Sequence, residues 1–264
     1  MVKVYTIASG KGGTGKTTTS ANLGTCLAEL GKETYVMDAD MGMANLGIIM
    51  GLEDVSITLH EVLAGNAKVS EAVYEGPCGV KVVPSGISLK GFQNADPDKL
   101  RDVMRELIGK CEFLIIDAPA GISRDGVIPL AIADEVILIV NPELSSMVDA
   151  LKTKILTELV GGTVKGAILT RATMENTEVS KQKMEEVLGV KVIGIIPEDP
   201  NTRRSAAYKA PIVVKYPNSD ASKAYRRIAA NLAGTSYSED LQIEKSRESF
   251  IDRLARSIFK AKKL

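Results

Sequence analysis

Short apolar runs alternate with amphipathic stretches along most of this 264-residue chain. The apolar runs have the length of strands, and the stretches between them repeat apolar positions with helical spacing. Runs such as 113–116 and 136–140 are apolar throughout, as strands buried between two helical layers require. The alternation predicts one α/β domain with a doubly wound, mostly parallel sheet. Strands are expected at 4–8, 34–37, 80–83, 113–116, 136–140, 166–169 and 191–196, and helices at 16–30, 97–109, 144–160, 178–188 and 219–232.

A glycine-rich segment joins the first expected strand to the first expected helix. It fits the phosphate-loop pattern G-x-x-x-x-G-K-[ST], in the strand–loop–helix context that the motif requires. Glycines let backbone N–H groups approach phosphate oxygens, and the positive end of the following helix points at the same place. Lys16 would neutralise the β- and γ-phosphates, and the Thr17 hydroxyl would ligate Mg²⁺. The residues expected to bind nucleotide here are Gly10, Gly12, Gly13, Thr14, Gly15, Lys16, Thr17 and Thr18.

Three aspartates follow expected strands at the edge of the sheet where ligands bind in open α/β folds. Asp117 ends the run 113–116, and a carboxylate at this position can hold Mg²⁺ directly or through water. Gly121 could then bring a backbone N–H to the γ-phosphate. Asp38 and Asp40 follow the strand at 34–37, and such close carboxylates would repel each other unless a cation or an ordered water uses them.

Three passages resemble motifs of the MinD/ParA family of ATPases, and of MinD proteins most closely. In the run 9–18, Lys11 directly follows the first glycine, as in the family's deviant phosphate loop. The run 38–46 resembles the switch I pattern D-x-D-x-G-x-x-N-L, and 117–121 resembles switch II. The resemblance extends in order from about residue 3 to residue 232. It implies the P-loop NTPase fold, with ATP and Mg²⁺ as cofactors.

The resemblance also implies roles for individual residues. Lys11 would reach across a dimer to the nucleotide of the other subunit, and would act in catalysis with Lys16 and Asp40. Asp40 would orient the attacking water. Asp38 and Asp117 would belong to the shell of Mg²⁺.

Family members read adenine from two neighbouring segments, which correspond here to 169–171 and 197–199. The resemblance therefore implies Arg171, Pro197 and Asp199 as base-binding residues. The asparagine that many members carry after the first of these strands has no clear match in this chain. Adenine as the base rests on the resemblance, since the chain has no guanine-specifying N-K-x-D motif.

The last part of the chain differs from the ATPase domain, which we expect to span residues 1–233. A linker is expected at 234–246 and an amphipathic helix at 247–264. From residue 246 onwards the chain has six basic and two acidic residues, a net charge of +4. Such a helix suits an anionic membrane surface, and the tail resembles the C-terminal targeting helix of MinD proteins. Packing on its own domain or on a partner protein is the alternative. Its expected apolar half contains Phe250, Ile251, Leu254, Ala255, Ile258 and Phe259.

The remaining composition narrows the compartment and the partners. The three cysteines are far apart, which argues against a disulfide framework and fits a reducing cytoplasm. No leader and no apolar run near 18 residues is present, so the chain is expected on the inner face of the membrane rather than across it. Lys plus Arg equals Asp plus Glu at 33 each. The doublets 203–204 and 226–227 are interpreted as solvated surface, and His60 as structural, so DNA is not expected as a partner.

The function implied is that of an ATPase that dimerises with ATP, binds anionic lipid reversibly and regulates division-site placement through a protein effector. A ParA-like partition ATPase that binds DNA, or a related positioning factor for flagella or other polar structures, would share the same phosphate site. A nucleotide switch with negligible turnover would differ only in its hydrolysis rate. An iron–sulfur scaffold ATPase is disfavoured, because the chain has no C-x-x-C pair.

Overall fold

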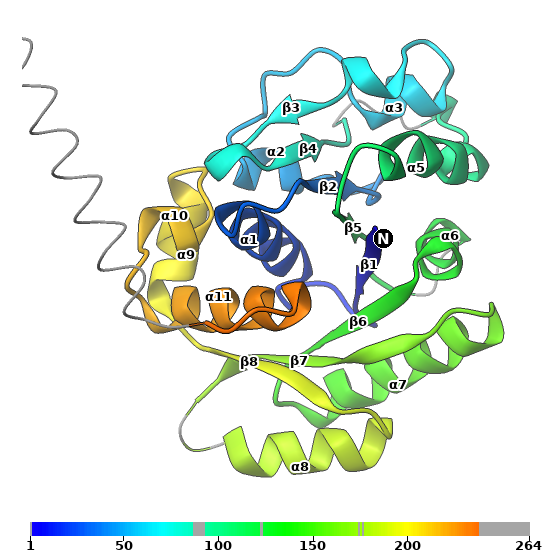
Figure 1. The fold of residues 1–264 in the computed structure, drawn as a ribbon. Coiled ribbons are helices and arrows are strands. Elements are labelled where there is room, and N and C mark those ends of the chain that lie inside the picture. The colour runs from blue at the N-terminus through cyan, green and yellow to red at the C-terminus, as the bar shows by residue number, and fades with distance from the viewer. Residues whose placement is uncertain (1, 87–92, 122–123, 174, 176, 238–264) are drawn as a thin grey trace, which may run out of the picture.

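A single sheet of eight strands runs through the centre of the computed structural model, which describes residues 2–86, 93–121, 124–173, 175 and 177–237 (Figure 1). The strand order is β3-β4-β2-β5-β1-β6-β7-β8, and every pair is parallel except β3 with β4. The predicted doubly wound, mostly parallel sheet is confirmed. The strands are β1 (Lys3–Ala8), β2 (Thr34–Asp38), β3 (Tyr74–Glu75), β4 (Lys81–Val83), β5 (Phe113–Asp117), β6 (Glu135–Val140), β7 (Val164–Ala172) and β8 (Val192–Pro197).

Helices cover both faces of the sheet (Figure 1). On one face α1 (Lys16–Glu29) and α11 (Asp220–Ala233) pack together, with α10 (Ile212–Lys215) beside them. The opposite face is covered by two groups of helices, one over β2 and β5 and one over β6 and β7. The other helices are α2 (Leu46–Ile49), α3 (Leu59–Leu63), α5 (Leu100–Ile108), α6 (Arg124–Ile132), α7 (Leu144–Leu159), α8 (Thr177–Leu188) and α9 (Pro200–Ala207), with short 3₁₀ turns at Val69–Glu71, Pro77–Gly79 and Pro97–Lys99.

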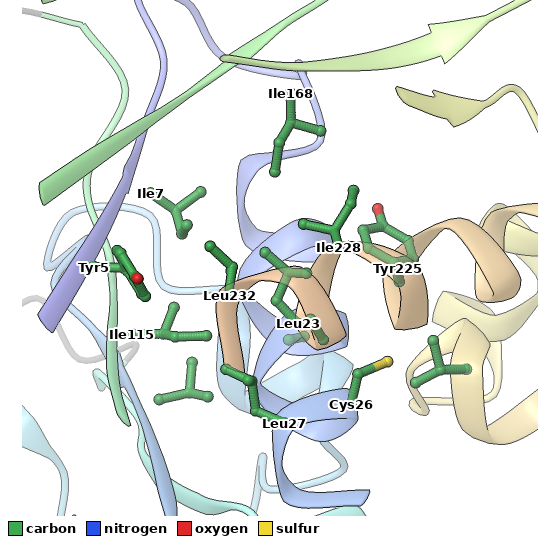
Figure 2. Packing of buried hydrophobic residues seen from close by; sticks show 14 of the residues in the cluster. Tyr5, Ile7, Leu23, Cys26, Leu27, Ile115, Ile168, Tyr225, Ile228 and Leu232 are labelled. Carbon is green, nitrogen blue, oxygen red and sulfur yellow. The ribbon is translucent and has the colours of Figure 1, made fainter. Parts of the chain in front are cut away.

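Alternate residues of the central strands supply the two cores. Tyr5 and Ile7 of β1 point toward α1 and α11, whereas Val4 belongs to the core on the other face. Figure 2 shows Leu23 and Leu27 of α1 packed between β1 and α11. Burial on both faces explains why the strands carry continuous apolar runs.

The predicted strands and helices are all present, with bounds that differ by a few residues. The region 97–109 is a 3₁₀ turn followed by α5 rather than one helix. The pattern did not predict α6, because Pro129 lies inside it and removes a helical hydrogen bond. The Pro129 carbonyl accepts a hydrogen bond from the Thr6 hydroxyl at 2.7 Å, which joins α6 to β1. Nor did the pattern predict β3, which has two residues.

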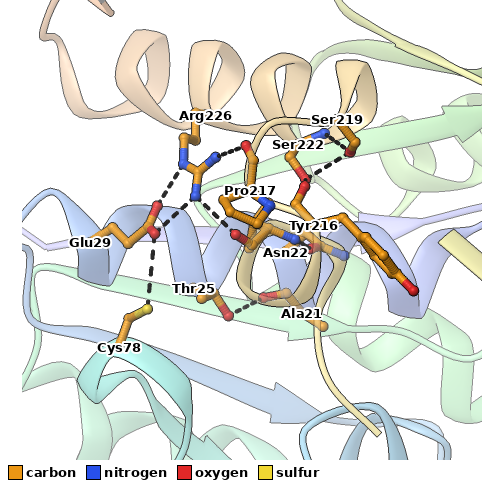
Figure 3. A network of polar contacts seen from close by, with 11 residues as sticks. Ala21, Asn22, Thr25, Glu29, Cys78, Tyr216, Pro217, Ser219, Ser222 and Arg226 are labelled. Carbon is orange, nitrogen blue, oxygen red and sulfur yellow. Dashed lines mark hydrogen bonds and ion pairs between the residues drawn. The ribbon is translucent and has the colours of Figure 1, made fainter. Parts of the chain in front are cut away.

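One of the basic doublets is not solvated surface, and that interpretation is wrong for Arg226 (Figure 3). The Arg226 guanidinium is buried and donates two hydrogen bonds to the Glu29 carboxylate, at 2.9 and 3.0 Å. It also donates to the carbonyls of Pro217 and Val213. Arg227, the next residue, is exposed. The Arg226 side chain therefore joins α11 to the end of α1 and to the α10 segment.

Helix α11 runs along the strands, from the end of the sheet that carries the phosphate loop to the end where β1 begins. The hydroxyl of Tyr225 lies 3.4 Å from that of Thr19, in the first turns of α1. Toward its other end, the Leu232 carbonyl accepts a hydrogen bond from Lys3, the first residue of β1. The linker predicted at 234–246 lies mostly outside the described residues, and the helix predicted at 247–264 lies wholly outside them. Within the described part of the chain, every helix is too short or too polar to cross a membrane.

Candidate functional site

The predicted phosphate loop lies between β1 and α1, at the carboxyl edge of the sheet. Gly15 has a φ of 93°, a left-handed conformation that turns the chain into α1. Gly10 is required for a different reason. A Cβ at Gly10 would lie 2.3 Å from the carbonyl oxygen of Asp149, because α7 packs directly against the loop. The loop therefore packs against α7 at Gly10 and continues into α1 after Gly15.

Asp117 lies beside the first turns of α1. Its Oδ1 accepts a hydrogen bond from the Ser20 hydroxyl at 2.9 Å and lies 4.0 Å from the Lys16 Nζ. The Thr17 side chain lies close enough to this carboxylate to lower its pKa. Burial raises the pKa of Asp117, and the Lys16 charge opposes that rise. The structure therefore brings together Lys16, Thr17 and Asp117, as the sequence predicts.

The second oxygen of Asp117 has no hydrogen-bond partner although it is buried. A buried carboxylate oxygen without a partner is costly in an empty site, and a hard cation or its water would satisfy it. The side chains of Asp117 and Thr17 therefore fit Mg²⁺. Within the described residues no group of three or more His, Cys, Asp or Glu side chains forms a metal cage. Mg²⁺ typically keeps several waters and binds one or two carboxylates together with phosphate, so such a cage is not needed.

Asp38 is fully buried opposite Asp117, at the end of the neighbouring strand. Its two oxygens accept hydrogen bonds from the backbone N–H groups of Asp40, at 3.0 Å, and Leu46, at 3.2 Å. Burial, together with the charge of Asp117, raises the pKa of Asp38 well above its usual range. Asp38 therefore closes the loop between β2 and α2. Its assignment to the Mg²⁺ shell stays a prediction, and it would require an oxygen that already accepts a backbone hydrogen bond to bind the metal or its water as well.

Asp40 lies on that loop and is partly exposed. Its Oδ1 accepts a hydrogen bond from the backbone N–H of Met43 at 2.9 Å. The other carboxylate oxygen leaves Asp40 capable of accepting a proton from, or orienting, a water molecule.

Two predicted phosphate contacts have other partners in this structure. The Lys11 ammonium donates to Glu143 at 2.8 Å and lies 3.4 Å from the Ser145 hydroxyl, both in the segment that starts α7. The Gly121 N–H donates to the Ser9 carbonyl at 3.2 Å. Each contact with a nucleotide, which stays a prediction, would require the present bond to open.

A pocket beside the loop contains all three residues predicted to bind the base. Arg171, Pro197 and Asp199 line it. The Asp199 carboxylate is partly engaged, because it caps α9 through the N–H of Asn201 at 2.9 Å. The other lining residues are Thr14, Gly15, Thr18, Thr170, Ile196, Glu198, Thr202, Arg203 and Tyr225.

Sequence reasoning missed several residues of this site. Ser20 lies four positions after Lys16, on the same side of α1, and this spacing could have marked it. Thr170 has its hydroxyl 2.8 Å from the carbonyl of Thr14 and from Oδ1 of Asn141, so it ties the loop to β6 and β7. Tyr225 had no signal in the sequence, because only the folding of α11 against α1 places it at the pocket.

Comparisons with known proteins agree with this geometry. A protein of Methanocaldococcus jannaschii described only as ATP-binding is 48% identical over 259 residues, which cover 98% of this chain and 97% of that protein. The cell division ATPase MinD of Pyrococcus furiosus superposes with a TM-score of 0.84 at 35% identity, over 89% of this chain and 99% of that one. The septum site-determining protein MinD of Pyrococcus horikoshii, solved with Mg-ADP, gives 0.83 at 36%, over 88% and 96%.

The family model of the CobQ/CobB/MinD/ParA nucleotide binding domain matches residues 5–212, from the first strand to the start of α10. The match includes the phosphate loop, Asp117 and most of the pocket beside the loop. The resemblance inferred from the three motifs is confirmed: this chain belongs to the CobQ/CobB/MinD/ParA family of nucleotide-binding proteins.

Proposed function

We propose that this protein is a MinD-type ATPase. It binds ATP with Mg²⁺, forms a face-to-face dimer, and attaches reversibly to the cytoplasmic face of the membrane through residues 247–264. In the cell it regulates the placement of the division site together with a protein effector. The observation that carries the enzymatic part is the buried, unpartnered oxygen of Asp117 beside Lys16 and Thr17.

The site residues divide the work of phosphoryl transfer among them. Backbone N–H groups of the loop cradle the phosphates, and Lys16 stabilises the negative charge on the β- and γ-phosphate oxygens. Mg²⁺, when held by Thr17 and Asp117, neutralises charge that develops on those oxygens. Asp40 orients the water for in-line attack.

The second lysine supports a dimer as the active form. Lys11 is partly exposed and its partner Glu143 is more so, and exposed ion pairs of this kind contribute only about 0–1 kcal/mol. The phosphates of a second subunit's nucleotide offer Lys11 a larger negative charge than Glu143 does. Exchange of partners is therefore favourable once two loaded subunits meet.

Membrane attachment rests on the composition of the C-terminal segment. A short amphipathic helix with a net charge of +4 binds anionic lipid weakly on its own. Two such segments on one dimer bind cooperatively, because the second association is intramolecular. ATP binding and hydrolysis would in this way control residence on the membrane.

The enzymatic proposal is tested by nucleotide titration and phosphate release. Lys16→Ala should abolish binding of Mg-ATP, whereas Lys32→Ala, beyond the opposite end of α1, should leave it unchanged. Asp40→Ala should still bind ATP, should slow hydrolysis by a factor on the order of 10² or more, and should accumulate as a dimer in size-exclusion chromatography with light scattering. Turnover of Asp40→Ala at the parent rate would refute the role of Asp40.

The membrane proposal is tested by co-sedimentation with vesicles of phosphatidylglycerol and phosphatidylethanolamine, with ATP and with ADP. The full chain should sediment only with ATP, and a chain ending at Ser246 should not sediment. Leu254→Asn removes one residue of the predicted apolar half, leaves the net charge of the segment unchanged and should also abolish binding. Sedimentation of Leu254→Asn at the parent level would show that charge alone attracts the chain. No sedimentation of the full chain would direct the search to DNA or a protein partner.

A further inference from the structure

The only histidine in the chain contacts the loop that carries Asp40. His60 lies in α3 and is 1% exposed. Its Nε2 is 3.1 Å from the carbonyl oxygen of Met41, the residue directly after Asp40. A carbonyl oxygen only accepts, so Nε2 carries the proton in this bond. The imidazole therefore donates to the loop from a different element of the fold.

Several contacts fix the position of His60. Its helix begins with a capping box, in which the Glu61 carboxylate accepts a hydrogen bond from the Thr58 N–H at 2.9 Å. The N–H of Leu59 donates to the Pro84 carbonyl at 2.9 Å, which ties the same helix to the end of β4. A Cβ at Gly86 would lie 2.8 Å from His60 Nδ1, so the backbone that follows β4 packs closely against the imidazole ring at Gly86.

The loop between β2 and α2 is closed at its two ends and contacts α3 in its middle. Asp38 holds both ends, through the N–H groups of Asp40 and Leu46. The Asp40 carboxylate bonds the Met43 N–H, which is a contact inside the loop. The bond from His60 fixes the carbonyl of Met41 against α3. The Met41 N–H, which belongs to the planar peptide group between Asp40 and Met41, donates to the Ala39 carbonyl at 3.1 Å. Met41 is therefore held at both its N–H and its carbonyl, and this restricts the backbone dihedrals that aim the Asp40 side chain.

We propose that His60 is a positioning residue for ATP hydrolysis, which holds the Asp40 loop through the Met41 carbonyl and so sets the place of the attacking water. The inference rests on the proposed function, in which Asp40 orients that water. His60 itself touches neither nucleotide nor water. Its effect comes from geometry, since a misplacement of about 1 Å at a reacting group can cost a factor on the order of 10² in rate.

The bond has a chemical requirement that substitutions can separate from simple burial. His60→Ala removes the donor and leaves the buried Met41 carbonyl without it. His60→Gln keeps an N–H donor at the position of Nε2. Leu63→Ala creates a cavity in the same helix, where Leu63 is fully buried, and leaves the bond to the loop in place. Leu63→Ala is thus the matched control for loss of stability in α3.

The test measures kcat and KM for ATP together with the Kd for Mg-ADP at a temperature where all variants are folded by circular dichroism. We expect His60→Ala to lower kcat about tenfold with Kd within about twofold of the parent. His60→Gln should recover most of kcat, and Leu63→Ala should keep it. Equal loss in His60→Ala and Leu63→Ala, or no recovery in His60→Gln, would assign His60 to the core alone.

A second measurement asks whether His60 acts through Asp40. In Asp40→Ala, the further change His60→Ala should not alter the residual rate, because the loop no longer carries the group that orients water. An additional tenfold loss in that background would overturn the inference. If the parent protein does not hydrolyse ATP, the proposed function fails. If it does hydrolyse ATP and His60→Ala matches it, only this inference fails.

Discussion

The buried pair between α1 and α11 allows a quantitative prediction of stability. Arg226→Met keeps the aliphatic length of the side chain and removes four hydrogen bonds, two to Glu29 and one each to Pro217 and Val213. Breaking a buried ion pair by removing one partner costs about 3–5 kcal/mol.

The geometry of the pair reduces this figure. The Glu29 side chain is 27% exposed, so water can solvate part of the carboxylate that Arg226 leaves behind. The carbonyl of Val213 has no such relief, because Val213 is buried. We therefore expect Arg226→Met to lower the free energy of unfolding by about 2–4 kcal/mol. For a domain of this size that is a fall in Tm of about 4–16 °C.

The assay is equilibrium unfolding in urea, followed by circular dichroism. Arg227→Met is the matched control, since it removes the same charge one position along from an exposed site. It should change the free energy of unfolding by less than about 0.5 kcal/mol. Glu29→Gln combined with Arg226→Met should destabilise less than the sum of the two, by about 0.5–3 kcal/mol. Equal effects at 226 and 227 would refute the assignment of a structural ion pair.

Three further predictions concern the loop, the metal and the thiols. Gly10→Ala should lower the free energy of unfolding by about 1–3 kcal/mol in the same assay, because the new Cβ meets the Asp149 backbone. Gly12→Ala should have almost no effect, because its new Cβ would have no neighbour within 4 Å. Titration calorimetry with ADP should show that Mg²⁺ increases the affinity of the parent protein for ADP. Asp117→Asn should lose this increase, and the control Asp102→Asn, on α5, should retain it. An equal increase in Asp117→Asn would exclude Asp117 from the metal site. Burial raises the pKa of Cys111 to about 11, so a group that reacts as the thiolate is almost wholly protonated at pH 8. Its rate of maleimide labelling, followed by mass spectrometry, should therefore rise about tenfold per pH unit between pH 8 and 10, and a flat rate would contradict this; Cys26, which is buried, should react only in denaturant.

The fold was accessible from the sequence because it is encoded locally. Continuous apolar runs marked the buried strands, and the glycine-rich loop after the first strand placed the site. The grouping of Lys16, Thr17 and Asp117 followed from one rule, that ligands bind at the carboxyl edge of such a sheet. These features need no knowledge of which distant residues meet.

The features that the sequence could not predict depend on contacts between distant residues. Arg226 and Arg227 are identical neighbours in the sequence. The buried one is distinguished by its contacts with Glu29, 197 positions away, and with the carbonyls of Pro217 and Val213. Tyr225 reaches the pocket because α11 packs on α1. The present partners of Lys11 and Gly121, which are Glu143 and Ser9, likewise depend on tertiary packing.

The course of α11 also bears on how nucleotide could control the C-terminal segment. Tyr225 lines the pocket beside the phosphate loop, whereas the Leu232 carbonyl accepts a hydrogen bond from Lys3, the first residue of β1, at the other end of the strands. Seven helical residues separate the two by about 10 Å. The chain therefore departs toward its C-terminus on the side away from the phosphates, and a nucleotide cannot act on that segment by direct contact near the point of departure. If nucleotide controls that segment as proposed, a displacement of α11 or the pairing of two subunits would carry the effect, and the Arg226–Glu29 pair, which fixes α11 to α1, favours pairing.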